Sequence, residues 1–140
     1  MPQKKEAPGK SPILGNIRVL DLSRNLAGPY CTMILGDMGA EIIKIEQPQH
    51  GDDTRNWAPP TWNGESTTFL SANRNKKSLA VDLNAPEGAE IVRSLAYRAD
   101  ILVESFRPHV MPGIGLGYEE LEKINAKDGH LGMDFIPGIP

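Results

Sequence analysis

Apolar positions along this chain form short runs separated by amphipathic or polar segments. Four runs have the pattern that is typical of strands: residues 17–22 (IRVLDL), 41–46 (EIIKIE), 78–83 (SLAVDL) and 101–103 (ILV). Apolar residues at helical spacing occupy residues 30–38 and the segment from Pro86 onward, and 118–125 (YEELEKIN) is a further short helix. This order, strand–helix–strand and then strand–helix–strand, predicts an α/β fold that is Rossmann-like, with a mostly parallel sheet flanked by helices.

Residues that commonly begin or end helices support these boundaries. Pro29 suits the first turn of the helix at 30–38, because its missing N–H costs nothing there, and Gly39 is placed to end that helix. Pro86 opens the second long helix, and acidic residues in its first turns favour the helix dipole. The residues predicted to share one apolar face of that helix are Ile91, Val92, Leu95 and Ala96.

Residues 48–67 interrupt the periodic pattern. This stretch holds three prolines, two glycines and two tryptophans among polar residues. Such a composition favours an ordered loop over a flexible linker.

Composition excludes several classes of protein. Of the 140 residues, 24% are charged and 39% hydrophobic, and the net charge is -3. These values are typical of a soluble globular domain, and they do not support a nucleic-acid binder that works by bulk charge. Cys31 is the single cysteine, so no internal disulfide can form and a reducing compartment is expected. No apolar run approaches the length of a membrane span.

The first residues are polar. Residues 1–13 contain lysine and proline but no apolar stretch of a secretory signal, so we interpret them as a disordered lead-in and expect a cytoplasmic location.

The turn SRNLAGP (23–29) is the first candidate for chemistry. Small residues allow a ligand to approach the backbone, and the N–H groups at the following helix start face anions. A plain strand–helix turn is the alternative, and local sequence alone favours it.

Two further segments could meet an anionic ligand. The segment NRNKKS (73–78) concentrates positive charge beside a predicted strand, although a solvated basic loop has the same composition. The segment VESFRP (103–108) ends another strand, where ligands of open α/β sheets bind. There Phe106 could pack on an adenine ring and Arg107 could meet a phosphate; the alternative is a core phenylalanine and a surface arginine.

Other patterns carry no chemistry. The run GIGLG (113–117) follows Met-Pro rather than a strand, so we reject a dinucleotide fingerprint. Cys31 lies in an apolar helical stretch and is expected to be a buried, inert thiol. Asp52 and Asp53 are expected to be solvated or to cap a turn. The three histidines have no metal-ligand spacing, so no metal site is predicted; they are His50, His109 and His130.

Residues 14–125 resemble the N-terminal segment of the family III CoA-transferases, the group of formyl-CoA transferase and carnitine CoA-transferase. The sequence segments that carry the resemblance occur in the same order as in the family: VLDLSRNLAGPYCTMILGDMGAEIIKIEQP, GDDTRNW, LSANRNKKSLAVDL, PEGAEIVRSLAYRADILVESFRP and GLGYEEL. Within the family, these segments most resemble the succinate–hydroxymethylglutarate (glutarate) CoA-transferase branch. The fold implied is the incomplete N-terminal part of the family's large domain.

The resemblance implies an activity and a binding site. Family members move CoA between carboxylic acids through an aspartate that attacks the acyl-CoA thioester. Coenzyme A thioester is then a substrate, no cofactor is tightly bound, and a mitochondrial location is also open. The residues implied to lie along the CoA site are Leu26, Ala27, Asn73, Arg74, Asn75, Lys76, Lys77, Ser105 and Phe106.

The chain also departs from the family pattern. Leu26 stands where a polar residue is frequent, Ser105 where asparagine is usual, and Gly113 where some relatives carry an adenine-stacking arginine. The family's catalytic aspartate lies beyond the position of Asn125, whereas this chain continues with a divergent, irregular tail (126–140). Neither aspartate of that tail has the family's context, so no catalytic residue is assigned.

Three hypotheses result. The first is a truncated CoA-transferase that is inactive alone, from a family whose members form interlocked homodimers. The second is a non-catalytic dimerisation partner or interfering subunit of the full-length enzyme. The third is a generic nucleotide-binding α/β module. No nucleic-acid or membrane partner is expected.

Overall fold

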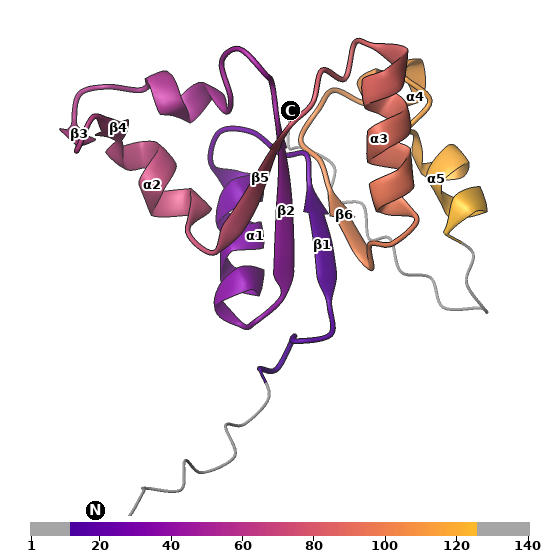
Figure 1. Cartoon of the computed structure of the whole chain (residues 1–140), viewed down its shortest axis with the longest axis horizontal. Coiled ribbons are helices and arrows are strands. Elements are labelled where there is room, and N and C mark those ends of the chain that lie inside the picture. Colours follow the sequence, from indigo (N-terminus) through magenta and orange to yellow (C-terminus); the bar gives the residue numbers. More distant parts are fainter. Residues whose placement is uncertain (1–11, 126–140) are drawn as a thin grey trace, which may run out of the picture.

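A four-stranded parallel sheet forms the centre of the molecule. The computed structural model describes residues 12–125. Its sheet contains β1 (Arg18–Asp21), β2 (Glu41–Glu46), β5 (Lys76–Ala80) and β6 (Ile101–Val103), in the order β5-β2-β1-β6. All neighbouring pairs are parallel, so the predicted α/β architecture with a parallel sheet is confirmed (Figure 1).

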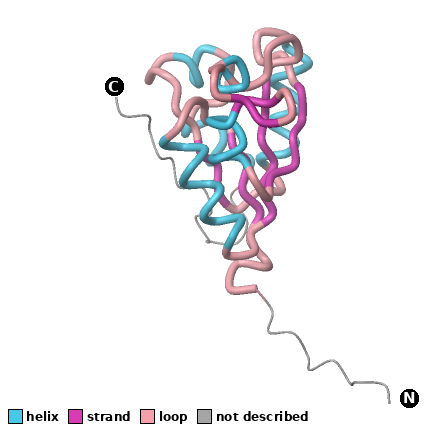
Figure 2. The backbone as a smooth tube through the Cα atoms, turned by 90° about the vertical axis from the view of Figure 1, so that its left-hand side faces the viewer, coloured by secondary structure: helices cyan, strands magenta, loops and turns pink. Residues whose placement is uncertain are grey.

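Helices pack against both faces of this sheet. They are α1 (Ala27–Asp37), α2 (Thr67–Asn73), α3 (Pro86–Ala96), α4 (Val110–Gly113) and α5 (Tyr118–Ile124). One buried cluster joins Leu20 and Leu102 of the sheet to Val92 of α3, and a second gathers Val19 and Ile42 on the opposite face. Side chains alternate between the faces of a strand, so β1, β2 and β6 each contribute to both clusters. Figure 2 shows the strands side by side with helices packed alongside them.

Helix ends follow the sequence signals closely. Gly39 has a φ of +103°, a conformation that glycine adopts without strain, and it follows Met38, the C-cap residue of α1. Pro86 is the first residue of α3, as predicted. In α3, Val92 and Ala96 are buried, whereas Ile91 is 48% exposed. The predicted apolar face of α3 is therefore only partly covered: Val92 and Ala96 pack in the core, whereas Ile91 faces solvent.

Several elements differ from the sequence prediction. Helix α4 was not predicted, and α1 begins at Ala27 rather than at residue 30. Helix α2 was not predicted, because its seven residues are too few to show a helical period; Ser66 caps it by accepting from the Phe69 N–H. Strand β5 begins at Lys76, two residues before the predicted Ser78, because pairing with β2 begins at the opposite residue, Ile42.

Residues 48–67 form an ordered loop, as expected. It contains a 3-10 helix (Asp53–Asn56) and a hairpin of β3 (Thr61–Trp62) and β4 (Glu65–Ser66). Asn63 and Gly64 connect the two strands with positive φ values, the backbone that a tight hairpin turn requires. In Figure 1 this hairpin lies far from β6, at the left-hand side of the view.

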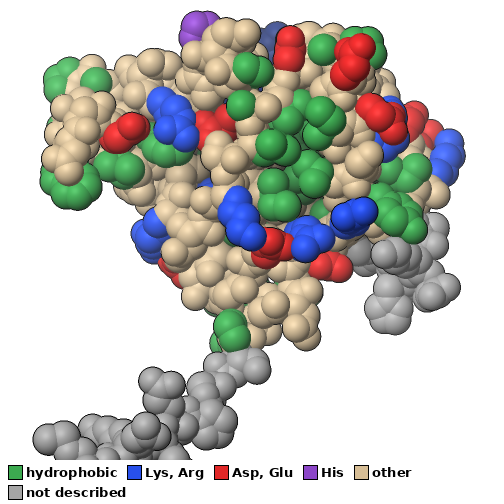
Figure 3. Space-filling model, viewed as in Figure 1, with side chains coloured by type: hydrophobic (Ala, Val, Ile, Leu, Met, Phe, Trp, Pro, Cys, Tyr) green, Lys and Arg blue, Asp and Glu red, His purple; other side chains and the backbone are tan. Residues whose placement is uncertain are grey.

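Part of the apolar surface remains uncovered. Leu79 of β5 is 37% exposed, and Ile91 of α3 is 48% exposed. The space-filling view in Figure 3 shows hydrophobic side chains gathered in the middle of this side of the molecule. Among residues 12–125 no helix is long and apolar enough to cross a bilayer. The predicted lead-in and divergent tail fall almost entirely on residues 1–11 and 126–140, outside the described residues.

Candidate functional site

The turn between β1 and α1 lies at the carboxyl edge of the sheet. Asn25 adopts a φ of 63°, a left-handed conformation that asparagine tolerates better than most residues. Leu26 occupies the N-cap of α1 without a side-chain cap, so the first N–H groups of this helix have no side-chain acceptor there. Leu26 is 51% exposed and Ala27 is exposed as well. The turn thus presents backbone donors to solvent.

Gly28 permits close packing within this turn. A Cβ atom at Gly28 would lie 2.3 Å from the Cβ of Ser23, a distance at which one of them must move. Ser23 is fully buried, and its N–H and hydroxyl both donate to the Asp21 carboxylate. The lack of a side chain at Gly28 therefore allows the start of α1 to pack closely against Ser23.

The segment after β6 contacts the same turn. The Arg24 N–H donates to Ser105 Oγ at 2.9 Å, and the Arg24 guanidinium lies 5.0 Å from the centroid of the Phe106 ring. Glu104 accepts from the Phe106 N–H at 2.6 Å, and burial raises the pKa of the Glu104 carboxyl. The turn and the segment 104–106 are thus brought together, and Lys76 of the third sequence candidate also reaches the turn at Pro29 O.

A buried row of charges lies beneath the turn. Lys44 is 1% exposed; its Nζ donates to the Ser23 carbonyl at 2.9 Å and lies 2.8 Å from Asp52 Oδ2. This second contact is an ion pair without hydrogen-bond geometry, since Asp52 Oδ2 accepts no hydrogen bond in the described part of the chain. Next to it, Lys76 Nζ lies 3.0 Å from Asp21 Oδ2. Two lysines and two aspartates therefore form two buried ion pairs.

Asp52 also holds the loop after β2. Its Oδ1 accepts from both the N–H and the hydroxyl of Thr54, which caps the 3-10 helix. Burial opposes the charge of Asp52, but the contacts with Lys44 and Thr54 outweigh it and hold the pKa of Asp52 below its usual value. The expectation that this aspartate caps a turn is correct, but it is buried and paired rather than solvated.

The basic segment 73–77 is divided by the structure. Lys76 points inward, whereas Arg74 and Asn75 both donate to Asp37 at the end of α1. Lys77 is exposed and pairs with Glu41 at the start of β2, at 2.6 Å. Arg74 and Lys77 thus lie toward the amino ends of the strands, away from the turn at the carboxyl edge. Their pairing with surface carboxylates matches the alternative reading of a solvated basic loop.

Glu46 connects the end of β2 to the following loop. It accepts from Arg55 through both carboxylate oxygens and from Ser78, and Arg55 also stacks on the ring of Phe69 at 3.7 Å. Burial opposes the charge of Glu46, but the hydrogen bonds from Arg55, Ser78 and the Asp52 N–H lower its pKa from 4.5 to about 2. The ionised carboxylate is therefore part of the native structure.

A pH titration should reveal this carboxylate. A depressed pKa in the folded state means that the contribution of Glu46 to stability is complete above pH 4.5 and is lost as the pH falls towards about 2. We expect Glu46→Gln to lower the free energy of unfolding at pH 7 and to flatten its pH dependence between those limits. Urea unfolding across this range measures both effects, and a variant with the wild-type pH profile would contradict this role.

The structure also places the other residues considered in the sequence analysis. Within residues 12–125 no cluster of three metal-ligating side chains occurs. Cys31 is half-buried rather than fully buried as expected. The run GIGLG follows α4 and not a strand, which agrees with its rejection as a dinucleotide fingerprint.

Sequence reasoning missed the buried charges at the carboxyl edge, namely Asp21, Lys44 and Glu104. A signal was present, because Lys44 interrupts two isoleucines in a strand that is otherwise buried. A charge on the inward side of a parallel strand requires a partner, and the sequence did not indicate which residue that is.

Comparison with known proteins shows the family of this chain. The model of CoA-transferase family III matches residues 14–127. Succinyl-CoA:glutarate CoA-transferase of Mus musculus is 56% identical over 111 residues, which are 79% of this chain and 26% of that relative. Succinate–glutarate CoA-transferase of Agrobacterium fabrum is 42% identical over 128 residues, with 87% and 32% covered.

A solved structure shares the fold. The crystal structure of a CAIB/BAIF family protein from Brucella suis superposes with a TM-score of 0.78 at 40% identity, covering 83% of this chain and 32% of that one. The chain thus spans about a quarter to a third of the length of these relatives. Since the family model covers most of the sequence and the fold agrees, this chain belongs to CoA-transferase family III.

Proposed function

We propose that residues 14–125 are the N-terminal, CoA-binding portion of an enzyme that moves CoA between an acyl-CoA and a free carboxylic acid. One observation carries this proposal. The β1–α1 turn, with its uncapped helix start, lies against Ser105 and Phe106 at the carboxyl edge of a parallel sheet. Ligands of open α/β sheets bind at that edge, and a helix start favours phosphate groups.

The chemistry of coenzyme A fits these residues. Its diphosphate can accept from the backbone of Leu26 and Ala27, and its adenine can pack on an aromatic ring such as Phe106. Ser105 already contributes a hydroxyl to the turn. Asn73 and Lys76 are proposed to border the same site, because Lys76 donates to Pro29 O in the turn and to Asn73. Arg74, Asn75 and Lys77 pair with Asp37 and Glu41 away from the turn, so no contact with the ligand is proposed for them. No tightly bound cofactor is proposed.

The proposed donor and acceptor come from the relatives. The mouse and Agrobacterium relatives are named for succinate or succinyl-CoA and glutarate. We therefore propose succinyl-CoA as donor and a dicarboxylate such as glutarate as acceptor, in the cytoplasm or in mitochondria. The full-length enzyme is proposed to be a homodimer.

The 140-residue chain by itself is proposed to be inactive, because the family's nucleophilic aspartate corresponds to a position beyond Asn125. Incubation with succinyl-CoA and glutarate should give no glutaryl-CoA above a control without protein. Turnover above that control would overturn this part of the proposal.

Binding is tested separately from turnover. Isothermal titration of the chain with CoA should give saturable binding, and ATP, which lacks the pantetheine arm, should bind more weakly. Absence of CoA binding would contradict the proposed function. Equal affinity for the two ligands would instead favour a generic nucleotide-binding module.

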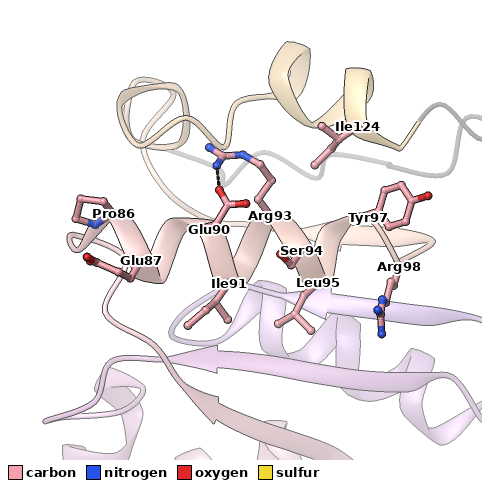
Figure 4. Close-up of a pocket in the computed structure, with 10 residues that line it drawn as sticks. All are labelled: Pro86, Glu87, Glu90, Ile91, Arg93, Ser94, Leu95, Tyr97, Arg98 and Ile124. Atoms are coloured by element: carbon pink, nitrogen blue, oxygen red, sulfur yellow. Dashed lines mark hydrogen bonds and ion pairs between the residues drawn. The ribbon is translucent and has the colours of Figure 1, made fainter.

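An interfering subunit is the second candidate, and uncovered apolar surface favours it. A hollow runs along α3, and Figure 4 shows two of its lining side chains, Ile91 and Leu95, projecting from the same side of the helix. Ile91 and Leu79 are both exposed. Such surface is common where another chain packs. Co-expression with a full-length relative followed by pull-down tests this role, and failure to co-purify would remove it.

A further inference from the structure

The Lys76 ammonium is saturated by groups of the protein itself. Its Nζ donates to Pro29 O at 2.8 Å, to Asp21 Oδ2 at 3.0 Å and to Asn73 Oδ1 at 3.0 Å. A lysine ammonium has three protons to donate, so no donor remains for another acceptor. The side chain is only 2% exposed, which also keeps a ligand away from it.

Each acceptor belongs to a different element. Asp21 ends β1, Pro29 lies in the first turn of α1, and Asn73 is the last residue of α2. The Asn73 side chain is itself oriented, because its amide donates to the Phe69 carbonyl at 2.9 Å. One ammonium thus fixes the start of α1, where Leu26 and Ala27 present their backbone, relative to the sheet and to α2.

The partner carboxylate is equally engaged. Asp21 Oδ1 accepts from the N–H and hydroxyl of Ser23, and Oδ2 accepts from Thr32 Oγ1 at 2.6 Å as well as from Lys76. Burial lowers the pKa of Lys76, and the charge of Asp21 opposes this shift. Removing Lys76 would leave a buried carboxylate without its cation.

We propose that Lys76 is a positioning residue of the CoA site, which orients the β1–α1 turn and donates to no phosphate of the ligand. This inference rests on the proposed function for its ligand, but the saturation of the ammonium can be tested without any ligand. It assigns Lys76 and Asn73 to the support of the turn, whereas Leu26 and Ala27 meet the ligand.

The first experiment observes the ammonium directly. In proton–nitrogen NMR spectra of the whole chain near neutral pH, ammonium protons of exposed lysines exchange too fast to be detected. A buried Lys76 with three acceptors should give a protected ammonium signal that Lys76→Arg removes. Absence of that signal in the wild-type chain would overturn the proposal even if CoA binds.

Adding CoA extends the same experiment. The Leu26 and Ala27 amide signals should shift while the ammonium signal keeps its nitrogen shift and its protection. Loss or displacement of the ammonium signal would mean that Lys76 turns to the ligand, which contradicts a positioning role. If no amide signal shifts, the proposed CoA binding fails, while the protected ammonium still decides how Lys76 is held.

The second experiment separates positioning from phosphate binding. Arginine binds phosphate at least as well as lysine, so Lys76→Arg would preserve CoA affinity if Lys76 only met a phosphate. The same variant keeps the charge but cannot place a planar guanidinium among three converging acceptors. We therefore expect Lys76→Arg to weaken CoA binding about tenfold or more, while Lys123→Met on the exposed side of α5 leaves CoA binding unchanged. A Lys76→Arg variant with the CoA affinity of the wild type would overturn the proposal.

Discussion

Replacing Lys44 with methionine is expected to lower the free energy of unfolding by about 3–5 kcal/mol, or to prevent folding. Methionine fills a similar volume, so the loss comes from charge rather than from a cavity. Asp52 would remain buried beside an apolar side chain, and the Ser23 carbonyl would lose its donor. Urea unfolding followed by circular dichroism measures the effect.

A matched variant tests whether burial is the cause. Lys77→Met removes the same charge from an ion pair in which the lysine side chain is 73% exposed. Exposed pairs contribute about 0–1 kcal/mol, so this variant should stay close to the wild type. The double variant Lys44→Met with Asp52→Asn should recover part of the loss, because no uncompensated charge remains. Equal effects of the two lysine variants would contradict the buried pair.

Gly28→Ala is expected to disturb both stability and ligand binding. The new methyl group would lie 2.3 Å from the Ser23 Cβ and 2.4 Å from its Oγ, and Ser23 is held by Asp21. Overpacking of this kind costs about 1–3 kcal/mol. The higher helix propensity of alanine, worth up to about 1 kcal/mol, offsets only part of it. A displaced turn should also weaken CoA binding about tenfold or more.

Gly113→Ala provides the control for folding, since a Cβ at Gly113 meets no atom within 4 Å. It should leave the free energy of unfolding within about 0.5 kcal/mol of the wild type. Gly28→Ala with wild-type stability and wild-type CoA affinity would show that the turn tolerates a different arrangement.

The apolar runs were sufficient to predict three of the four central strands and both long helices. The pattern of apolar residues within each run is enough to predict a buried strand at residues 17–22, 41–46 and 101–103. Helix α2 depends instead on packing against α1 and the loop after β2, which no local pattern encodes.

Part of the candidate site was also predictable, because some of its segments carry a local sequence signal. The turn at 23–29 and the segment 103–108 each carry a local signal, but their contact joins Arg24 to Ser105, 81 positions apart. In the basic segment 73–77, the local sequence does not show which lysine is buried. Its lysines look equivalent in sequence, yet adjacent residues of a strand point to opposite faces, so Lys76 is buried with Asp21 while Lys77 is exposed.

The hairpin after β2 has a practical consequence for spectroscopy. The two tryptophans of the chain, Trp57 and Trp62, lie in and beside it and are 49% and 65% exposed. Indole fluorescence therefore reports the local environment of this hairpin and not the melting of the core. Iodide quenching should be efficient in the native protein, and a change in emission would signal movement of the hairpin while the sheet is still intact.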